Sequence, residues 1–209
     1  MKTSFQTVDL DVDIGAAPLP AVDAIVVGAS AGGVEALLKI FTPLRLGYTL
    51  PIIAVLHVPD ERRSQLAEVF MSRLRIPVKE ADDKEALVPG TLYFASPGYH
   101  LSIEADLTFS FSQEERVFYS RPSIDILFDS AAEAFGPRLA GVLLTGANSD
   151  GAYGLSRIKQ GGGFTVVQDP SQAQARAMPD AALALHTPDY LLPLRDIGAL
   201  LVELERTAC

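Results

Sequence analysis

The stretch that decides the fold is AIVVGASAGGVEALLKIF, residues 24–41. Its first four residues are apolar and predict a short buried strand, which runs at once into Gly28-Ala29-Ser30. Apolar residues then recur at the spacing of one helix face, at Val34, Leu37, Leu38 and Phe41. A buried strand that turns sharply into a helix begins a strand–helix–strand unit, which builds a parallel sheet covered by helices.

The same alternation continues along the chain. Further buried strands are predicted at 52–56, near Val78, and at 92–95, 142–144, 164–167 and 191–192. Helices with apolar faces are predicted around 66–70, 124–135, 155–158 and 197–204, and Pro179 suits the first turn of a shorter one. Gly136 is expected to end the helix 124–135 in a left-handed conformation.

One segment differs, because apolar residues alternate singly on both sides of a turn near Asp106. This pattern over 101–103 and 107–111 predicts an antiparallel hairpin. We therefore expect an α/β fold with three layers, α/β/α, in which a mostly parallel Rossmann-like sheet carries one antiparallel hairpin.

The domain organisation follows from length and composition. With 209 residues, of which 48% are hydrophobic, the chain suits one large domain or two small ones. We expect one domain over 21–209, because no linker or repeat interrupts it. Residues 1–20 are expected to form a mobile tail, since Gly15, Pro18 and Pro20 follow closely on an alternating segment. An added edge strand over 8–14 is the alternative.

Composition also excludes several functions. Seventeen basic against twenty-six acidic residues give a net charge of −9, which argues against nucleic acid and anionic membranes as partners. The single Cys209 and three histidines offer neither a disulfide framework nor material for a metal cage. No signal peptide is recognisable, and no apolar run approaches the ~18 residues of a membrane span. We expect a cytoplasmic protein without direct membrane insertion.

Residues with catalytic chemistry follow the predicted strands, at the edge where parallel sheets bind ligands. Ser30 follows the first strand, His57 the second, and Asp150 lies in the loop after 142–144. A serine hydroxyl becomes nucleophilic when an imidazole takes its proton and an acid orients that imidazole. The three residues can therefore form a Ser-His-Asp triad, with Asp125 and Asp169 as rival acids.

Each triad residue also has a plainer interpretation. The segment around Ser30 reads G-x-S-x-G, the pattern of a nucleophile elbow, but Ser30 can equally be a helix N-cap. His57 can be a satisfied core residue, and Asp150 an N-cap or turn residue. The other histidines, His100 and His186, are weaker candidates because neither follows a predicted parallel strand. The motifs taken singly leave these alternatives open.

Taken in order, the motifs resemble the catalytic domain of the CheB-type chemotaxis protein-glutamate methylesterases. The resemblance spans about residues 24–205. It rests on GASAGG (28–33), HVP (57–59), VPG (88–90) with Tyr93 and Ala95, RPSIDILF (121–128), TG (145–146), DGA (150–152), QDP (168–170) and AMP (177–179).

The resemblance implies hydrolysis of glutamate γ-methyl esters on chemoreceptor cytoplasmic helices, with release of methanol and without metal or organic cofactor. Some members also deamidate receptor glutamines. By position, Ser30 would be the nucleophile, His57 the general base and Asp150 the orienting acid. The amide of Ala31 is the candidate oxyanion donor. The other expected pocket residues are Gly32, Ala147 and Arg121.

The chain departs from the family pattern at two pocket positions. The family usually has methionine where Ala147 stands and often threonine where Ala31 stands. These smaller side chains motivate the alternative of a non-catalytic regulatory or binding module that retains the methylesterase fold. A nucleotide-binding Rossmann domain is disfavoured, because Ser30 interrupts the glycine fingerprint.

Regulation and partners follow from the same resemblance. Typical members carry an N-terminal receiver domain, and the 23 residues before the first strand cannot hold one. The alternatives are a stand-alone catalytic domain, a part of a longer protein, or a fragment, and a separate regulatory domain or chain is a candidate partner. The expected partner is the methylated cytoplasmic domain of a chemoreceptor. Because such helices carry many glutamates, we expect basic residues such as Arg121, rather than acidic ones, near Ser30.

Overall fold

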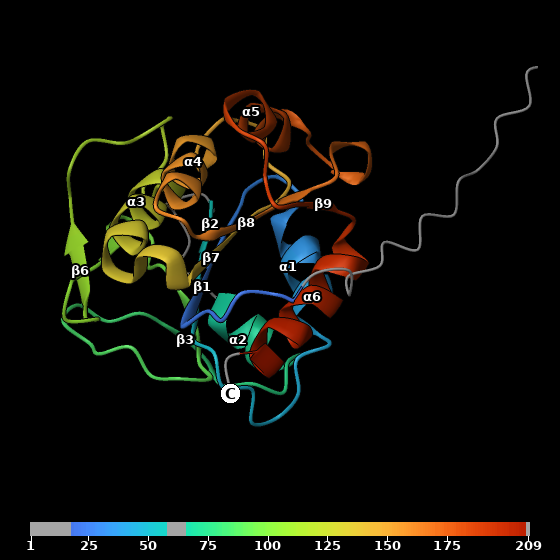
Figure 1. The fold of residues 1–209 in the computed structure, drawn as a ribbon. Coiled ribbons are helices and arrows are strands. Elements are labelled where there is room, and N and C mark those ends of the chain that lie inside the picture. The colour runs from blue at the N-terminus through green and yellow to red at the C-terminus, as the bar shows by residue number, and fades with distance from the viewer. Residues whose placement is uncertain (1–17, 58–65, 208–209) are drawn as a thin grey trace, which may run out of the picture.

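The computed structural model describes residues 18–57 and 66–207. Within them, seven strands form one parallel sheet, in the spatial order β3-β4-β2-β1-β7-β8-β9 (Figure 1). The strands are β1 (Ala24–Ala29), β2 (Ile52–Leu56), β3 (Val78–Glu80), β4 (Leu92–Phe94), β7 (Leu139–Leu143), β8 (Phe164–Gln168) and β9 (Tyr190–Leu192).

Helices cover both faces of this sheet (Figure 1). One face carries α1 (Gly33–Phe41), α2 (Leu66–Met71) and α6 (Leu194–Thr207). The other carries α3 (Ile124–Phe135), α4 (Ala152–Gln160) and α5 (Ala177–Leu185). Two short 3₁₀ turns, η1 (Gly136–Arg138) and η2 (Pro170–Gln172), complete the helical segments. The predicted three-layer α/β/α fold is therefore confirmed.

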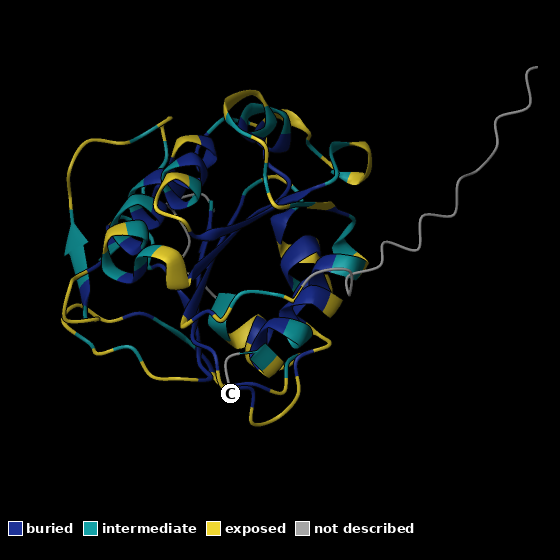
Figure 2. Ribbon diagram, in the orientation of Figure 1, coloured by how far each residue is buried: buried dark blue, intermediate teal, exposed yellow. Residues whose placement is uncertain are grey.

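The sheet separates two hydrophobic cores, and β1 shows why its sequence is apolar throughout. Ile25 and Val27 pack into the core on the α1 side, whereas Ala24 and Val26 pack into the core on the α3 side. Successive side chains of a strand point to opposite faces, so a strand covered on both faces buries every residue. Figure 2 shows the sheet and the inner helix faces as the buried part of the molecule.

The hairpin predicted around Asp106 is also present. Strands β5 (His100–Ile103) and β6 (Phe109–Ser112) pair antiparallel, with His100 opposite Ser112. The hairpin packs beside α3, and Leu101, Ile103 and Phe109 join the core on that side (Figure 1). It thereby places the segment that follows β6 next to the beginning of α3.

The topology brings three loops to one edge of the sheet. From β1 the chain proceeds to β2 on one side, and it later returns to β7 on the other side. Backbone hydrogen bonds tie the strand ends together, from the Ser30 amide to the Thr145 carbonyl (2.9 Å) and from the His57 amide to the Ala29 carbonyl (3.1 Å). A reversal of strand order of this kind leaves a crevice in which α/β proteins bind ligands.

Helix α1 differs from its prediction in the face that it buries. The structure buries Ala36, Leu37, Ile40 and Phe41, whereas Val34 is 41% exposed and Leu38 is half-buried. The helix begins at Gly33, where an added Cβ would lie 2.4 Å from Leu56 Cδ1. This close approach of the first turn to the sheet leaves Val34 facing outward, while Leu38 packs against the margin of the core.

Two further predictions concern chain ends. Gly136 is the C-cap of α3, but with φ 55° and ψ −127° it lies outside the left-handed helical region, because the chain continues directly into η1. Residues 1–17 of the predicted tail lie outside the described residues. Of the other three, Leu19 packs against the core, and Thr207 Oγ1 donates to the Pro20 carbonyl at 3.1 Å.

Candidate active site

Ser30 lies in the turn between β1 and α1. The N-cap of α1 is Gly32, in the left-handed region at φ 80°, and no side chain caps this helix. The N-cap interpretation of Ser30 is therefore wrong. Gly32 is required for a second reason, because a Cβ there would lie 2.5 Å from Gln174 Oε1. Among the described residues, the amides of Ala31 and Gly32 have no backbone acceptor, so both can donate to an oxyanion.

His57 follows β2 and is paired with Asp150. The His57 Nε2 atom lies 2.8 Å from Asp150 Oδ2, and the Asp150 side chain is completely buried. A carboxylate only accepts hydrogen bonds, so Nε2 carries the hydrogen and Nδ1 of the neutral ring keeps a free electron pair. The hydroxyl of Ser120 lies 3.3 Å from Nδ1 and donates to it.

Asp150 owes its position to the first turn of α3. Its Oδ1 accepts from Ser123 Oγ (2.8 Å) and the Asp125 amide (3.0 Å), and its Oδ2 accepts from the Ile124 amide (2.8 Å). Burial alone would raise the pKa of this carboxyl, but the hydrogen bond from His57 and those from the two amides outweigh it and hold the pKa below its ordinary range. Asp150 is therefore a carboxylate at neutral pH.

The arrangement is reciprocal, because Asp125 in turn caps α4. Asp125 Oδ1 accepts from the amides of Gly151 (2.9 Å) and Gly154 (2.7 Å). Each of the two helices is thus capped by a carboxylate from outside it, and the N-cap of α4 is Gly151 rather than Asp150. The rival acids have other partners: Asp125 binds these amides, and Asp169 caps η2 by accepting from the Ser171 amide.

Asp125 makes the stability of the fold dependent on pH. Burial, with a contribution from the nearby Asp150 carboxylate, raises its pKa to about 6, although the Gly154 and Gly151 amides oppose this. The folded protein therefore holds a proton that the unfolded chain releases near pH 3.8. Stability from this group is fully present below pH 3.8 and is lost as the pH rises to about 6.

Asp125→Asn should consequently stabilise the protein at neutral pH. The amide oxygen can still accept from Gly151 and Gly154 but carries no charge. We expect a gain of about 1–2 kcal/mol at pH 7.5, discounted for partial exposure, which shrinks towards pH 4. Urea denaturation of variant and wild type at both pH values measures it. A variant that is less stable than the wild type at pH 7.5 would contradict the assignment.

Ser30 and His57 line one pocket of about 400 Å³. Its wall is largely apolar and includes Val34, Leu38 and Leu56, which explains the outward face of α1. The remaining lining residues are Gly32, Gly33, Glu35 and Gln174. A small apolar pocket beside a hydroxyl and an imidazole suits an uncharged acyl group.

The expected charge distribution at this edge is not observed. The acidic Glu35 lines the pocket, whereas Arg121 is not among the lining residues. The Arg121 Nη1 atom instead donates to the carbonyls of Gln113 and Glu114, both at 2.9 Å. This arginine therefore anchors the segment after β6. Ala147 is exposed and lines neither this pocket nor the adjacent one.

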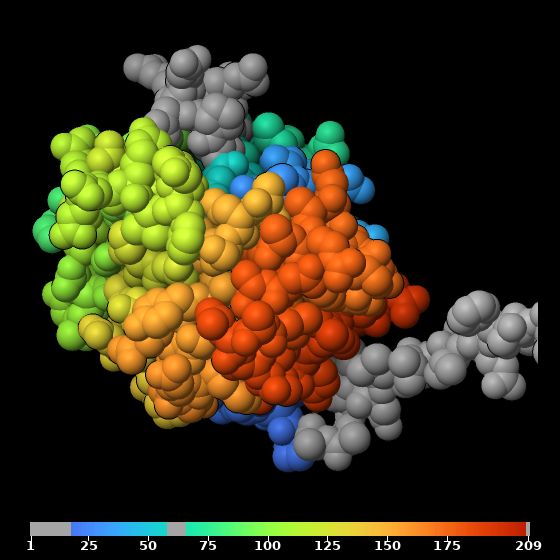
Figure 3. Space-filling view, turned by 90° about the horizontal axis from the view of Figure 1, so that it is seen from above, coloured from blue at the N-terminus to red at the C-terminus, as the bar shows by residue number. Residues whose placement is uncertain are grey.

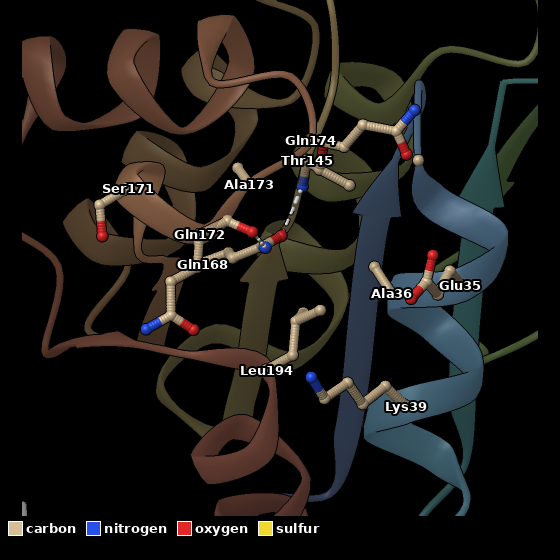
Figure 4. A pocket seen from close by; sticks show the side chains of 11 residues that line it. Glu35, Ala36, Lys39, Thr145, Gln168, Ser171, Gln172, Ala173, Gln174 and Leu194 are labelled. Atoms are coloured by element: carbon tan, nitrogen blue, oxygen red, sulfur yellow. Dashed lines mark hydrogen bonds between the residues drawn. The ribbon is translucent and has the colours of Figure 1, made fainter.

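A polar pocket of about 380 Å³ adjoins the first and shares Gly32, Glu35 and Gln174 with it (Figure 4). Gln168 spans its floor, accepting from the Thr145 amide (2.9 Å) and donating to the Gln172 carbonyl (3.3 Å). Thr145 Oγ1 in turn donates to the Ala31 carbonyl at 2.8 Å. These hydrogen bonds connect the turn that contains Ser30 to the ends of β7 and β8 and so help to hold the turn in place.

Several residues of the site were not identified from the sequence. Ser120 lies in an irregular segment without periodicity, so no pattern pointed to it. Ser123 precedes an apolar-periodic helix, a recognisable N-cap signal, and its hydroxyl accepts from the Ile126 amide as well as donating to Asp150. The buried His100 supports both segments, accepting from the Ser123 amide (3.1 Å) and donating to the Glu115 carbonyl (3.0 Å).

Neither a metal site nor a membrane span is found in residues 18–57 and 66–207. No group of three or more histidine, cysteine or acidic side chains is arranged to hold a metal ion in this part of the chain. None of its helices is long and apolar enough to cross a bilayer.

Comparison with known proteins identifies the family. The family model described as CheB methylesterase matches residues 25–201. A putative protein-glutamate methylesterase/protein-glutamine glutaminase of Leptospira interrogans is 45% identical over 184 residues, which cover 88% of this chain and 95% of that protein. The protein-glutamate methylesterase FrzG of Myxococcus xanthus is 34% identical over 188 residues, which cover 90% of this chain and 56% of that protein.

A solved structure agrees. The crystal structure of the Thermotoga maritima CheB methylesterase catalytic domain matches with a TM-score of 0.84 at 31% identity, covering 88% of this chain and 100% of that one. The resemblance inferred from the motifs is thereby confirmed. Given a family model over most of its length and close relatives in sequence and in structure, the chain belongs to the CheB methylesterase family.

Proposed function

We propose that this protein is a cytoplasmic serine hydrolase that removes the methyl group from glutamate γ-methyl esters on the cytoplasmic helices of chemoreceptors. In this reaction the methyl ester and water give glutamate, methanol and a proton. One observation carries the proposal, namely that His57 is fixed by buried Asp150 so that its unprotonated Nδ1 remains beside the pocket lined by Ser30. The names of the relatives, protein-glutamate methylesterase/protein-glutamine glutaminase, indicate the substrate.

The first half of the reaction forms an acyl-enzyme. His57 Nδ1 takes the proton of Ser30 Oγ, and the oxygen attacks the ester carbonyl. The amides of Ala31 and Gly32 stabilise the resulting oxyanion. When the tetrahedral intermediate collapses, methoxide leaves and takes the proton from Nδ1 as methanol, so that the glutamyl group remains bonded to Ser30.

Water completes the turnover. It transfers a proton to Nδ1 and attacks the acyl-enzyme, after which Ser30 Oγ leaves and regains that proton. The Asp150 carboxylate stabilises the imidazolium that forms in both halves. A glutamine side chain follows the same route with ammonia as the leaving molecule.

In the part of the chain that the structure describes, no hydrogen bond joins Ser30 Oγ to His57 Nδ1. Among the described residues, the hydroxyl bonded to Nδ1 is that of Ser120, at a long 3.3 Å. A bond of this length is weak, so Ser30 displaces it at small cost when substrate is bound. Catalytic hydrogen bonds commonly tighten in this way only in the complex with substrate.

The non-catalytic alternative is not favoured. A module without activity would not need a completely buried carboxylate with four donors, one of them the imidazole. Such a network is costly to build unless every donor is satisfied, and here it orients a ring beside an open pocket.

Methanol release from methylated receptor fragments tests the proposal. We expect the protein to release methanol from at least one fragment of a panel, and none from the unmethylated fragments. A fluorophosphonate probe, which labels activated serines, is run in parallel. Labelling without methanol release from any fragment would overturn the receptor as substrate, and the absence of both would overturn the serine hydrolase.

A further inference from the structure

The segment after β6 ends in a tight turn at the active site. Val117 and Ser120 exchange two backbone hydrogen bonds, of 3.1 and 2.8 Å, around the central residues Phe118 and Tyr119. Both central residues have positive φ, 46° and 64°, as a type I′ turn requires. Such turns favour asparagine and glycine, and a bulky residue at positive φ is strained by about 1 kcal/mol or more.

Two side chains hold this turn in place, one from the loop after β7 and one from the residue directly before the turn. Asn148 Nδ2 donates to the Phe118 carbonyl at 3.4 Å, and Arg116 Nη1 donates to the Tyr119 carbonyl at 3.4 Å. Figure 3, which views this edge of the sheet, shows the yellow-green segment against the gold segment to which Asn148 belongs. The strained conformation is therefore maintained by contacts on two sides.

The turn presents its aromatic rings to solvent. Tyr119 is 95% exposed and Phe118 48% exposed. A single exposed apolar side chain needs no explanation. Here, however, two neighbouring aromatic residues occupy positions that disfavour them sterically, and Tyr119 gains almost no burial in return. Strain of this kind gathers at functional sites, and tyrosine and phenylalanine are the residues that protein interfaces favour.

The turn is also joined to the catalytic base. Ser120 Oγ lies 3.3 Å from His57 Nδ1, the nitrogen that takes the serine proton. The exposed Tyr119 is the residue directly before Ser120. The pocket that His57 shares with Ser30 also has exposed apolar surface, at Val34 of α1. A partner whose side chain reaches Ser30 would therefore lie close to the exposed rings of the turn and to Val34.

We propose that the Val117–Ser120 turn is a docking element for the polypeptide that carries the esterified glutamate, with Phe118 and Tyr119 packing against apolar side chains beside that glutamate. This rests on the proposed function. The substrate is the fitting occupant because whatever covers these rings also covers the entrance to Ser30 and His57. Attraction comes from the rings, since Arg116 and Arg121 both donate to backbone carbonyls of the same segment.

The double substitution Phe118→Asn/Tyr119→Asn tests the proposal. Asparagine tolerates positive φ, so the variant loses the rings but keeps the turn. We expect kcat/KM for a methylated receptor fragment to fall at least about tenfold, chiefly through a higher KM. The ratio of this kcat/KM to that for p-nitrophenyl acetate should fall by a similar factor, because the small ester does not reach the rings.

Leu107→Asn is the matched control. Leu107 also has positive φ (62°) and is 39% exposed, but it lies in the turn between β5 and β6, at the opposite end of the hairpin. We expect the ratio of kcat/KM for the receptor fragment to kcat/KM for p-nitrophenyl acetate to equal that of the wild type. If the double variant keeps the wild-type ratio of the two kcat/KM values, whether both values stay the same or both fall equally, the docking proposal alone is overturned. A wild type that labels with fluorophosphonate but releases no methanol from any fragment overturns the proposed function instead, and docking with it.

Discussion

Ser30→Ala is expected to lower kcat/KM for ester hydrolysis at least about 10³-fold while the protein remains folded. Among the serines of residues 18–57 and 66–207, only Ser30 combines the three requirements of the nucleophile. It follows the central strand β1, it lines the pocket with His57, and it precedes the open amides of Ala31 and Gly32. Alanine removes the attacking oxygen and leaves the backbone of the turn as it is.

Ser120→Ala is the control that separates the role of Ser30 from that of the other serine near His57. Ser120 Oγ is the hydroxyl that contacts His57 Nδ1 in the resting protein, but Ser120 is not among the residues that line the pocket shared by Ser30 and His57. We expect this variant to retain activity within about tenfold of the wild type, since a neutral hydrogen bond contributes about 1 kcal/mol.

Fluorophosphonate labelling and methanol release distinguish the two serines. Wild type and Ser120→Ala should label, and Ser30→Ala should not. The reverse pattern, loss in Ser120→Ala with retention in Ser30→Ala, would make Ser120 the nucleophile. Wild-type turnover in a folded Ser30→Ala protein would remove the serine mechanism altogether.

The outline of the site could be predicted because strand ends are visible in the sequence. Ser30, His57 and the loop with Asp150 each follow a run of apolar residues, and the rule that parallel strands end at one edge brings them together. The pairing of His57 with Asp150 is therefore a consequence of strand order, which periodicity alone does not give. The last two residues of the HVP motif, Val58 and Pro59, lie outside the described residues.

What could not be predicted depends on contacts between distant segments. Asp150 is held by backbone amides of α3, which every sequence possesses, so no residue type marks them. Arg121 looked like a pocket residue because its charge suited an acidic substrate, but its partners are carbonyl groups eight and seven residues earlier. The outward face of α1 likewise depends on how closely Gly33 approaches Leu56.

Asp150→Asn should lower kcat about 10⁴-fold, the loss typical of an acid-to-amide change in a triad. Every partner of this carboxylate is a donor: His57 Nε2 and the Ile124 amide on Oδ2, and Ser123 Oγ and the Asp125 amide on Oδ1. An asparagine NH₂ must therefore oppose donors whichever way it points. Facing His57, it makes Nε2 an acceptor and moves the ring hydrogen to Nδ1, which can then no longer take the proton of Ser30.

The same substitution at the two neighbouring carboxylates should have opposite effects on stability. Asp150→Asn leaves buried donors unsatisfied and should destabilise the fold by about 1–3 kcal/mol. Asp125→Asn should stabilise it at pH 7.5, because the Asp125 pKa is raised to about 6 and its charge is unfavourable there. Urea denaturation of both variants at pH 7.5, with kcat measured on the same preparations, tests the pair. Equal stability of the two variants would show that the reciprocal caps of α3 and α4 are electrostatically equivalent, contrary to the opposite pKa directions of their carboxyls.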